Sequence, residues 1–194
     1  MSPLDGYGIA VVVAQAFERI GVDYFLGGSM ASSLQGPPRF TNDIDFVANL
    51  RAHHVQELKT ALGVDFEVDE VALLECVKAR RSWNIFHTPT ATRIDLFPVG
   101  SSEFDVEELM RRQRRDLGEG RSLFVKSPED TVLRKLDWYR NGGEANAQQF
   151  RDAVGVLQFQ GAALNQRYLD VWAPKVGVAE LLARARAASA SSAR

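Results

Sequence analysis

The stretch that decides the fold is Asp43-Ile44-Asp45-Phe46-Val47, in which acidic and apolar side chains alternate. Alternation with a period of two is typical of a β-strand that has one buried face. Residues two apart on a strand project to the same side. We therefore predict that Asp43 and Asp45 share one face, and that Ile44 and Phe46 point into the core.

Two carboxylates side by side are costly, because they repel each other unless a cation lies between them. Mg²⁺ takes oxygen ligands, and often only one or two carboxylates together with substrate phosphate. The pair Asp43 and Asp45 therefore indicates phosphoryl or nucleotidyl transfer with Mg²⁺ or Mn²⁺ as the cofactor. Two solvated aspartates at an exposed strand end are the alternative that the pair alone leaves open.

A glycine turn lies about fifteen residues upstream, where Gly27, Gly28 and Ser29 separate a predicted strand at 24–26 from a predicted short helix at 30–35. Glycine lets backbone N–H groups approach a phosphate closely, and the N-terminus of a helix favours anions. The Ser29 hydroxyl can add a contact. The motif predicts a phosphate-binding turn, and a turn that needs glycine only for its backbone conformation is the alternative.

A third carboxylate, Asp95, lies between Ile94 and Leu96 in a predicted strand at 93–97. We expect this strand to form a hairpin with residues 83–87. If it also neighbours the first aspartate pair, three carboxylates meet, and they could hold metal and act as a base toward an attacking hydroxyl. An ordinary solvent-facing aspartate is the alternative.

The chain changes character near residue 127, from a mixed α/β half to a helical half. Ser127 is a good helix cap and Pro128 suits the first helical position. The predicted fold class is α+β: a small mixed β-sheet core with flanking helices over residues 1–126, followed by a C-terminal helical subdomain over residues 127–194. Helices are expected at 5–21, 52–62, 105–111, 128–141, 147–160, 165–176 and 179–188, a further strand at 122–125, and a frayed tail at 187–194.

Composition is that of an ordinary globular protein, with 194 residues, 45% hydrophobic and 25% charged. The single cysteine, Cys76, cannot form an internal disulfide. No apolar run reaches membrane-spanning length, and the N-terminus lacks a signal-peptide pattern. We therefore expect a cytoplasmic protein without a membrane partner. The net charge of −2 gives no general attraction to nucleic acid.

Taken together, these motifs resemble the nucleotidyltransferase superfamily related to DNA polymerase beta, whose signature matches residues 26–29, 43–46 and 94–96. The run Arg39-Phe40-Thr41-Asn42-Asp43-Ile44-Asp45 is similar to the minimal nucleotidyltransferases of the AbiEii toxin type. The resemblance implies a nucleotidyltransferase core that moves a nucleoside monophosphate from a nucleoside triphosphate. It implies metal ligands at Asp43, Asp45 and Asp95, and triphosphate contacts at Gly27, Gly28, Ser29 and Arg39.

The helical half also carries part of this resemblance. Residues 127–136 resemble the branch's third motif, in which a helical lysine, here Lys135, contacts triphosphate. Residues 150–154 resemble the fourth motif, in which an aspartate, here Asp152, completes the site. From the residues alone, Lys135 is interpreted as solvated, Asp152 as a helix-surface charge and Trp138 as part of the core. Whether Asp95 or Asp152 completes the site stays open.

The resemblance leaves several acceptors open. The end of tRNA or another RNA and a protein hydroxyl are expected acceptors, with a toxin-like role and an antitoxin partner as a further expectation. The alternatives are a non-catalytic nucleotide-binding module of the same fold and a small-molecule, antibiotic-modifying nucleotidyltransferase. The basic cluster at 111–115 is interpreted as a solvated run, or else as a contact to RNA or DNA phosphates or to an acidic partner.

Overall fold

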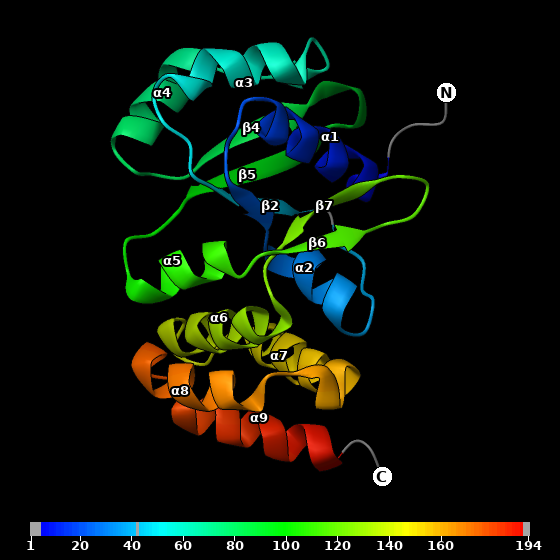
Figure 1. Cartoon of the computed structure of the whole chain (residues 1–194), viewed down its shortest axis with the longest axis vertical. Coiled ribbons are helices and arrows are strands. Elements are labelled where there is room, and N and C mark those ends of the chain that lie inside the picture. Colours follow the sequence, from blue (N-terminus) through cyan, green and yellow to red (C-terminus); the bar gives the residue numbers. More distant parts are fainter. Residues whose placement is uncertain (1–4, 42, 192–194) are drawn as a thin grey trace. The chain divides into compact units, whose positions relative to one another are not determined.

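The computed structural model describes residues 5–41 and 43–191, and these form a seven-stranded mixed sheet and nine α-helices (Figure 1). The α+β class predicted from the sequence is confirmed. The chain divides into two compact units, one of Met1–Met30 with Phe40–Val125, and one of Ala31–Arg39 with Lys126–Arg194.

The first unit contains the whole sheet, with the strand order β3-β4-β5-β2-β1-β7-β6. The pairs β2·β5 and β1·β7 are parallel and the others are antiparallel. The predicted hairpin is therefore confirmed, because β4 and β5 pair antiparallel. The strands are β1 (Tyr24–Leu26), β2 (Ile44–Ala48), β3 (Phe66–Glu67), β4 (Trp83–His87), β5 (Thr92–Pro98), β6 (Gln113–Asp116) and β7 (Ser122–Val125).

The alternating pattern of β2 follows the burial of its side chains. Ile44 and Phe46 are completely buried, whereas Asp45 between them is only partly buried. The Phe46 ring lies against those of Phe17 and Tyr24, with ring centroids 5.6 and 5.7 Å away. The apolar side chains of β2 therefore pack in the core. Its acidic side chains project from the opposite face of the strand.

Four complete helices accompany the sheet in the first unit. Helix α1 packs on β1 and β7 and against α3, and α3 packs against α4. Helix α2 (Gly28–Gln35) begins in this unit directly after β1 and continues into the second. The four complete helices are α1 (Gly6–Arg19), α3 (His54–Leu62), α4 (Glu70–Lys78) and α5 (Glu103–Met110).

The second unit is built on four helices, with α6 against α7 and α8, and α9 against α7 and α8. Its core is apolar, and Val132, Leu136, Val156 and Leu169 are fully buried. The Ser127 hydroxyl caps α6 by accepting a hydrogen bond from the Asp130 backbone N–H at 3.1 Å, as the sequence predicts. The helices are α6 (Pro128–Asn141), α7 (Ala147–Gln160), α8 (Gln166–Val176) and α9 (Ala179–Ser191).

Helix α9 runs to Ser191, so the prediction of a frayed tail from residue 187 is wrong for the described part. The physical reason is contact with α7: Gln158 Nε2 donates to the Ser189 carbonyl at 3.3 Å. Residues 192–194 lie outside the described residues. Sequence analysis also missed β3, α4 and β6.

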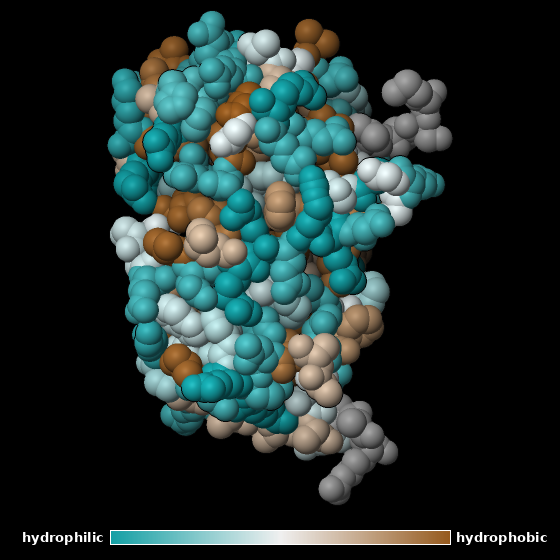
Figure 2. All heavy atoms as spheres, in the orientation of Figure 1, coloured by the Kyte–Doolittle hydropathy of each residue, from teal (hydrophilic) through white to brown (hydrophobic). Residues whose placement is uncertain are grey.

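No helix in the described part of the chain combines the length and apolarity needed to cross a bilayer. The face drawn in Figure 2 is mostly hydrophilic, with hydrophobic residues in small separate groups.

Candidate active site

A row of polar residues crosses the middle of the sheet in the first unit. Asp45 on β2 lies opposite Asp95 on β5, and Asp95 lies opposite Asn84 on β4. The Gly27 backbone N–H extends the row on the other side by donating to the Asp45 carbonyl at 2.8 Å. Opposite residues on paired strands project to the same face. The prediction that the strands of Asp45 and Asp95 are neighbours is therefore confirmed. Asn84 is brought beside Asp95 by the register between β4 and β5, which local sequence does not reveal.

Gly28 lies directly against the Asp45 side chain. A Cβ atom on Gly28 would overlap the Asp45 carboxylate, with Cγ at 2.6 Å and Cβ at 2.9 Å. The backbone of Gly28 also has φ of +56°, a region that residues with a side chain rarely adopt. Glycine is thus required here for two reasons, and the turn that opens α2 lies against an acidic side chain of β2.

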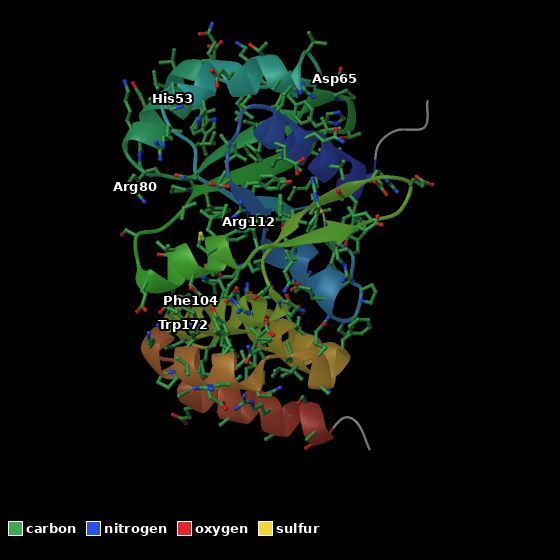
Figure 3. The ribbon with its side chains drawn as sticks, viewed as in Figure 1. His53, Asp65, Arg80, Phe104, Arg112 and Trp172 are labelled. Carbon is green, nitrogen blue, oxygen red and sulfur yellow. The ribbon has the colours of Figure 1, made fainter. Side chains whose placement is uncertain are left out.

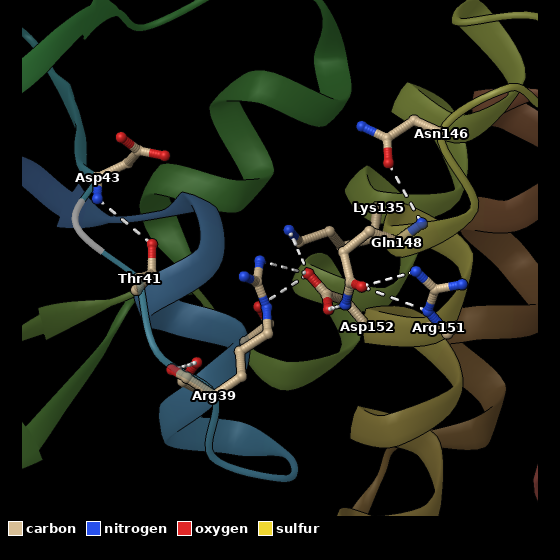
Figure 4. Close-up of polar contacts among 10 residues, drawn as sticks. Arg39, Thr41, Asp43, Lys135, Asn146, Gln148, Arg151 and Asp152 are labelled. Atoms are coloured by element: carbon tan, nitrogen blue, oxygen red, sulfur yellow. Dashed lines mark hydrogen bonds and ion pairs between the residues drawn. The ribbon is translucent and has the colours of Figure 1, made fainter.

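Asp43 precedes β2 by one residue and is exposed. Its backbone N–H donates to Thr41 Oγ1 at 3.3 Å (Figure 4). Because Ile44 and Phe46 are buried while Asp43 and Asp45 are not, the exposed side of the strand carries both carboxylates.

Asp95 is paired with Arg93, two residues earlier on the same strand. Arg93 Nη2 and Nε lie 2.7 and 2.8 Å from Asp95 Oδ1. The Arg93 side chain is 56% exposed, and pairs of this exposure contribute only about 0–1 kcal/mol. Such a pair is weak enough for a cation or a substrate to replace.

The described residues contain no group of three or more His, Cys, Asp or Glu side chains arranged to hold a metal ion. The metal site predicted at Asp43, Asp45 and Asp95 therefore stays a prediction. The donors present nevertheless suit a hard cation, because Mg²⁺ is often held by one or two carboxylates with substrate phosphate supplying the other oxygens.

The second unit contains a buried ion-pair cluster that sequence reasoning misjudged. Lys135 Nζ on α6 lies 2.8 Å from Asp152 Oδ2 on α7, and Arg39 Nη2 lies 3.2 Å from the same oxygen (Figure 4). The Lys135 and Asp152 side chains are only 3% and 5% exposed. The interpretation of Lys135 as solvated and of Asp152 as a surface charge is wrong, because helix packing turns both side chains inward.

Burial and pairing shift the pKa values of this pair. Burial lowers the pKa of Lys135, and its bond to Asp152 opposes that shift only in part. Burial raises the pKa of the Asp152 carboxyl, but hydrogen bonds from Lys135, Gln148 and Arg39 outweigh it and leave the pKa below its ordinary value. The cluster therefore favours the ionised form of the Asp152 carboxyl, whereas burial works against the charge on Lys135.

The acceptor positions of Asp152 are well occupied. Oδ2 accepts from Lys135, Arg39 and the Ser32 hydroxyl, and Oδ1 accepts from Gln148 Nε2 at 2.6 Å. These bonds join α6, α7, helix α2 through Ser32, and the loop after α2 through Arg39. The catalytic roles of Lys135 and Asp152 that the resemblance implies stay predictions.

The basic cluster at 111–115 is partly folded into the first unit. Arg112 (Figure 3) donates to Asp23 Oδ1 at 2.6 Å, and Arg114 lies 3.1 Å from Glu18 Oε2. Both guanidinium groups also lie about 5 Å from the centroid of the Phe124 ring on β7. The interpretation as a solvated run is wrong for Arg112, whose side chain is only 21% exposed, whereas Arg114 stays 48% exposed.

Trp138 on α6 is 42% exposed, so the prediction that it belongs to the core is also wrong. Cys76 is buried, as expected for a structural cysteine. His87 is buried against Thr90, with Nδ1 2.7 Å from Oγ1, which fits a structural role.

Comparison with known proteins rests on solved structures, since no protein-family model and no curated protein matches the chain. An antigenic nucleotidyltransferase-like protein from Paracoccidioides brasiliensis is 18% identical, with a TM-score of 0.54, covering 93% of this chain and 91% of its own. The antibiotic-resistance factor ANT(2'')-Ia in solution is 12% identical, with a TM-score of 0.52, covering 91% and 97%. The chain thus has the fold of nucleotidyltransferase-like proteins.

Proposed function

We propose that this chain is a nucleotidyltransferase that moves a nucleoside monophosphate from a nucleoside triphosphate to a hydroxyl acceptor. The observation that carries this is the row in the first unit: the Gly28 turn lies on Asp45, and Asp95 lies opposite Asp45 on a parallel strand. Phosphate-binding backbone and paired carboxylates are the two parts that this chemistry needs in one place.

Each residue of the row has a proposed task. The backbone N–H groups at Gly28 and Ser29, at the N-terminus of α2, would donate hydrogen bonds to phosphate oxygens of the triphosphate. Asp43, Asp45 and Asp95 would hold Mg²⁺ or Mn²⁺, which supplies neutralising charge to the phosphate oxygens. Asp95 would also accept the proton of the attacking hydroxyl.

The reaction itself is an in-line displacement. The acceptor oxygen forms a bond to the α-phosphorus, the bond from that phosphorus to the bridging oxygen breaks, and pyrophosphate leaves. The protein contributes position and electrostatic stabilisation and forms no covalent intermediate. The proton released by the acceptor passes to Asp95, which completes the balance of atoms.

The acceptor is best found by direct labelling. Pure protein is incubated with nucleoside triphosphates labelled at the α-phosphate, Mg²⁺, and in parallel bulk tRNA, cell protein and hydroxyl-bearing antibiotics. Antibiotics are included because one fold neighbour is an antibiotic-resistance factor. Label that appears with wild type and disappears with Asp45→Asn supports transfer. Binding of nucleotide without label in any acceptor would favour the non-catalytic module.

A toxin-like role of the AbiEii type would add a phenotype to this activity. Induced expression of wild type should then arrest growth, and Asp45→Asn should not. Equal growth of both strains would argue against a toxin and against the need for an antitoxin partner.

A further inference from the structure

A cavity of about 80 Å³ lies in the first unit, between the end of α4 and the sheet. Leu73 and Val77 of α4 line one side of it, and Leu96 of β5 lines the other. Leu96 directly follows Asp95, and neighbours along a strand project to opposite faces. The cavity is therefore on the apolar face of the sheet, opposite to the polar row, and the nucleotidyltransferase motifs do not account for it.

The floor of the cavity is apolar, and its mouth is positively charged. Leu73 and Leu96 are buried, whereas Arg80 and Arg81, which also line the cavity, are exposed (Figure 3). The Arg80 guanidinium donates to a neutral oxygen, the Val99 carbonyl, at 2.7 Å. Among the described residues, the Arg81 side chain has no hydrogen bond or ion pair, and no acidic side chain lines the cavity. The positive charge at the mouth is therefore available to an incoming anion.

The way in which α4 ends fixes the two arginines at this mouth. The Arg81 backbone N–H donates to the Cys76 carbonyl at 2.8 Å, and that of Arg80 donates to the Val77 carbonyl at 3.2 Å. These are the two bonds of a Schellman motif. Arg80 has φ of +53° in the left-handed position of this motif, where glycine is usual because it has no Cβ. Since the backbone conformation disfavours arginine here, the side chain at the mouth of the cavity explains its presence.

The size of the cavity limits the apolar part of a ligand, and the mouth limits its polar part. A cavity of roughly 150 Å³ holds benzene, so one of about 80 Å³ suits a short alkyl chain and excludes a nucleobase. A single guanidinium without a partner, that of Arg81, suits a carboxylate, because two parallel N–H···O bonds satisfy both oxygens. The ligand that fits both parts is a small carboxylate with an alkyl chain.

We propose that this cavity binds a small carboxylate whose alkyl chain lies between Leu73 and Leu96 and whose carboxylate bonds to Arg81, with Arg80 beside it. The ligand is distinct from the nucleotide, because it occupies the other face of the sheet and the cavity excludes a base. Binding needs neither metal nor nucleoside triphosphate, so the proposal does not rest on the proposed function.

The test uses pentanoate as the probe and follows the indole N–H signals of the three tryptophans by NMR. Trp83 lines the cavity, whereas Trp138 and Trp172 lie on α6 and α8, and Trp83→Phe identifies its signal. Pentanoate should shift the Trp83 signal saturably and leave the other two in place. Acetate, which has the charge without the chain, and 1-pentanol, which has the chain without the charge, should each bind about tenfold more weakly or worse.

Two variants separate the parts of the site. Arg81→Gln should weaken pentanoate about tenfold or more without weakening 1-pentanol, because only a charge-assisted hydrogen bond is lost. Val77→Phe fills the cavity and should abolish binding of both probes. Arg167→Gln is the matched control, since Arg167 is exposed on α8 and does not line the cavity.

Loss of pentanoate binding in Arg81→Gln, with Arg167→Gln unchanged, supports the site. A Trp83 signal that pentanoate does not move, equal binding of pentanoate by wild type and Arg81→Gln, or 1-pentanol as tight as pentanoate would each overturn it. Circular dichroism melting confirms that the variants are folded. Failure of nucleotidyl transfer would leave this result untouched, because the titration contains no nucleotide and no metal.

Discussion

Replacing Asp152 by alanine removes the carboxylate to which Lys135 is bonded in the buried cluster of the second unit. Lys135 Nζ lies 2.8 Å from Asp152, and both side chains are at most 5% exposed. Breaking a buried pair by removing one partner typically costs about 3–5 kcal/mol, because the remaining charge is left without compensation. That is a large share of the roughly 5–15 kcal/mol by which native proteins are stable.

The structure offers an exposed lysine–carboxylate pair as a control. Lys59 and Glu70 form a pair at 2.6 Å, but their side chains are 48% and 39% exposed. Exposed pairs of this kind contribute about 0–1 kcal/mol. Glu70→Ala should therefore cost far less than Asp152→Ala, although both remove the acidic partner of a lysine.

The assay is urea unfolding followed by circular dichroism. The double variant Lys135→Met with Asp152→Leu should recover most of the loss, because a buried ion pair replaced by apolar residues is often neutral. Equal and small decreases in the free energy of unfolding for Asp152→Ala and Glu70→Ala would contradict this prediction.

Two further predictions concern the pH dependence and the glycine turn. The pKa of Asp152 is lowered by folding, so its stabilisation is complete above the ordinary value of 3.8 and is lost as pH falls through the lowered folded value. The difference in unfolding free energy between wild type and Asp152→Asn should thus be constant near pH 6 and shrink below about pH 4; a difference that grows on acidification would contradict this. Gly28→Ala should destabilise by about 1–3 kcal/mol and abolish transfer, since φ is positive and Cβ meets Asp45. Gly118→Ala, with φ of +82° and open space around it, should show only the milder backbone cost, and equal effects would refute the overlap.

The alternation in residues 43–47 was enough to predict β2 and the burial of Ile44 and Phe46, because a strand with one buried face leaves a period of two in its own sequence. The start of α6 was equally local, since Ser127 and Pro128 act on the first turn alone. The acidic row was only half predictable. Asp45 and Asp95 carry a local signal, whereas Asn84 joins them through pairing of β4 with β5.

What could not be predicted depends on packing between distant segments. Lys135 and Asp152 lie on different helices, and which faces of α6 and α7 meet is not encoded in either helix alone. The arginine run carries only a charge signal in the sequence, yet the antiparallel pairing of β6 with β7 puts Arg114 opposite Phe124, and Arg112, just before β6, lies over the same ring. Long side chains of this kind can pack their stems on apolar surface while the charge stays paired.

The most direct test of the account is the rate of transfer from a nucleoside triphosphate labelled at the α-phosphate, measured for wild type, Asp45→Asn and Asp65→Asn. Asp65 is an exposed aspartate in the loop before β3 (Figure 3), so its replacement makes the same chemical change away from the row. We expect Asp45→Asn to lose about a hundredfold or more, and Asp65→Asn to match wild type. Undiminished transfer by folded Asp45→Asn protein would contradict the central claim that the acidic row on the sheet performs the chemistry.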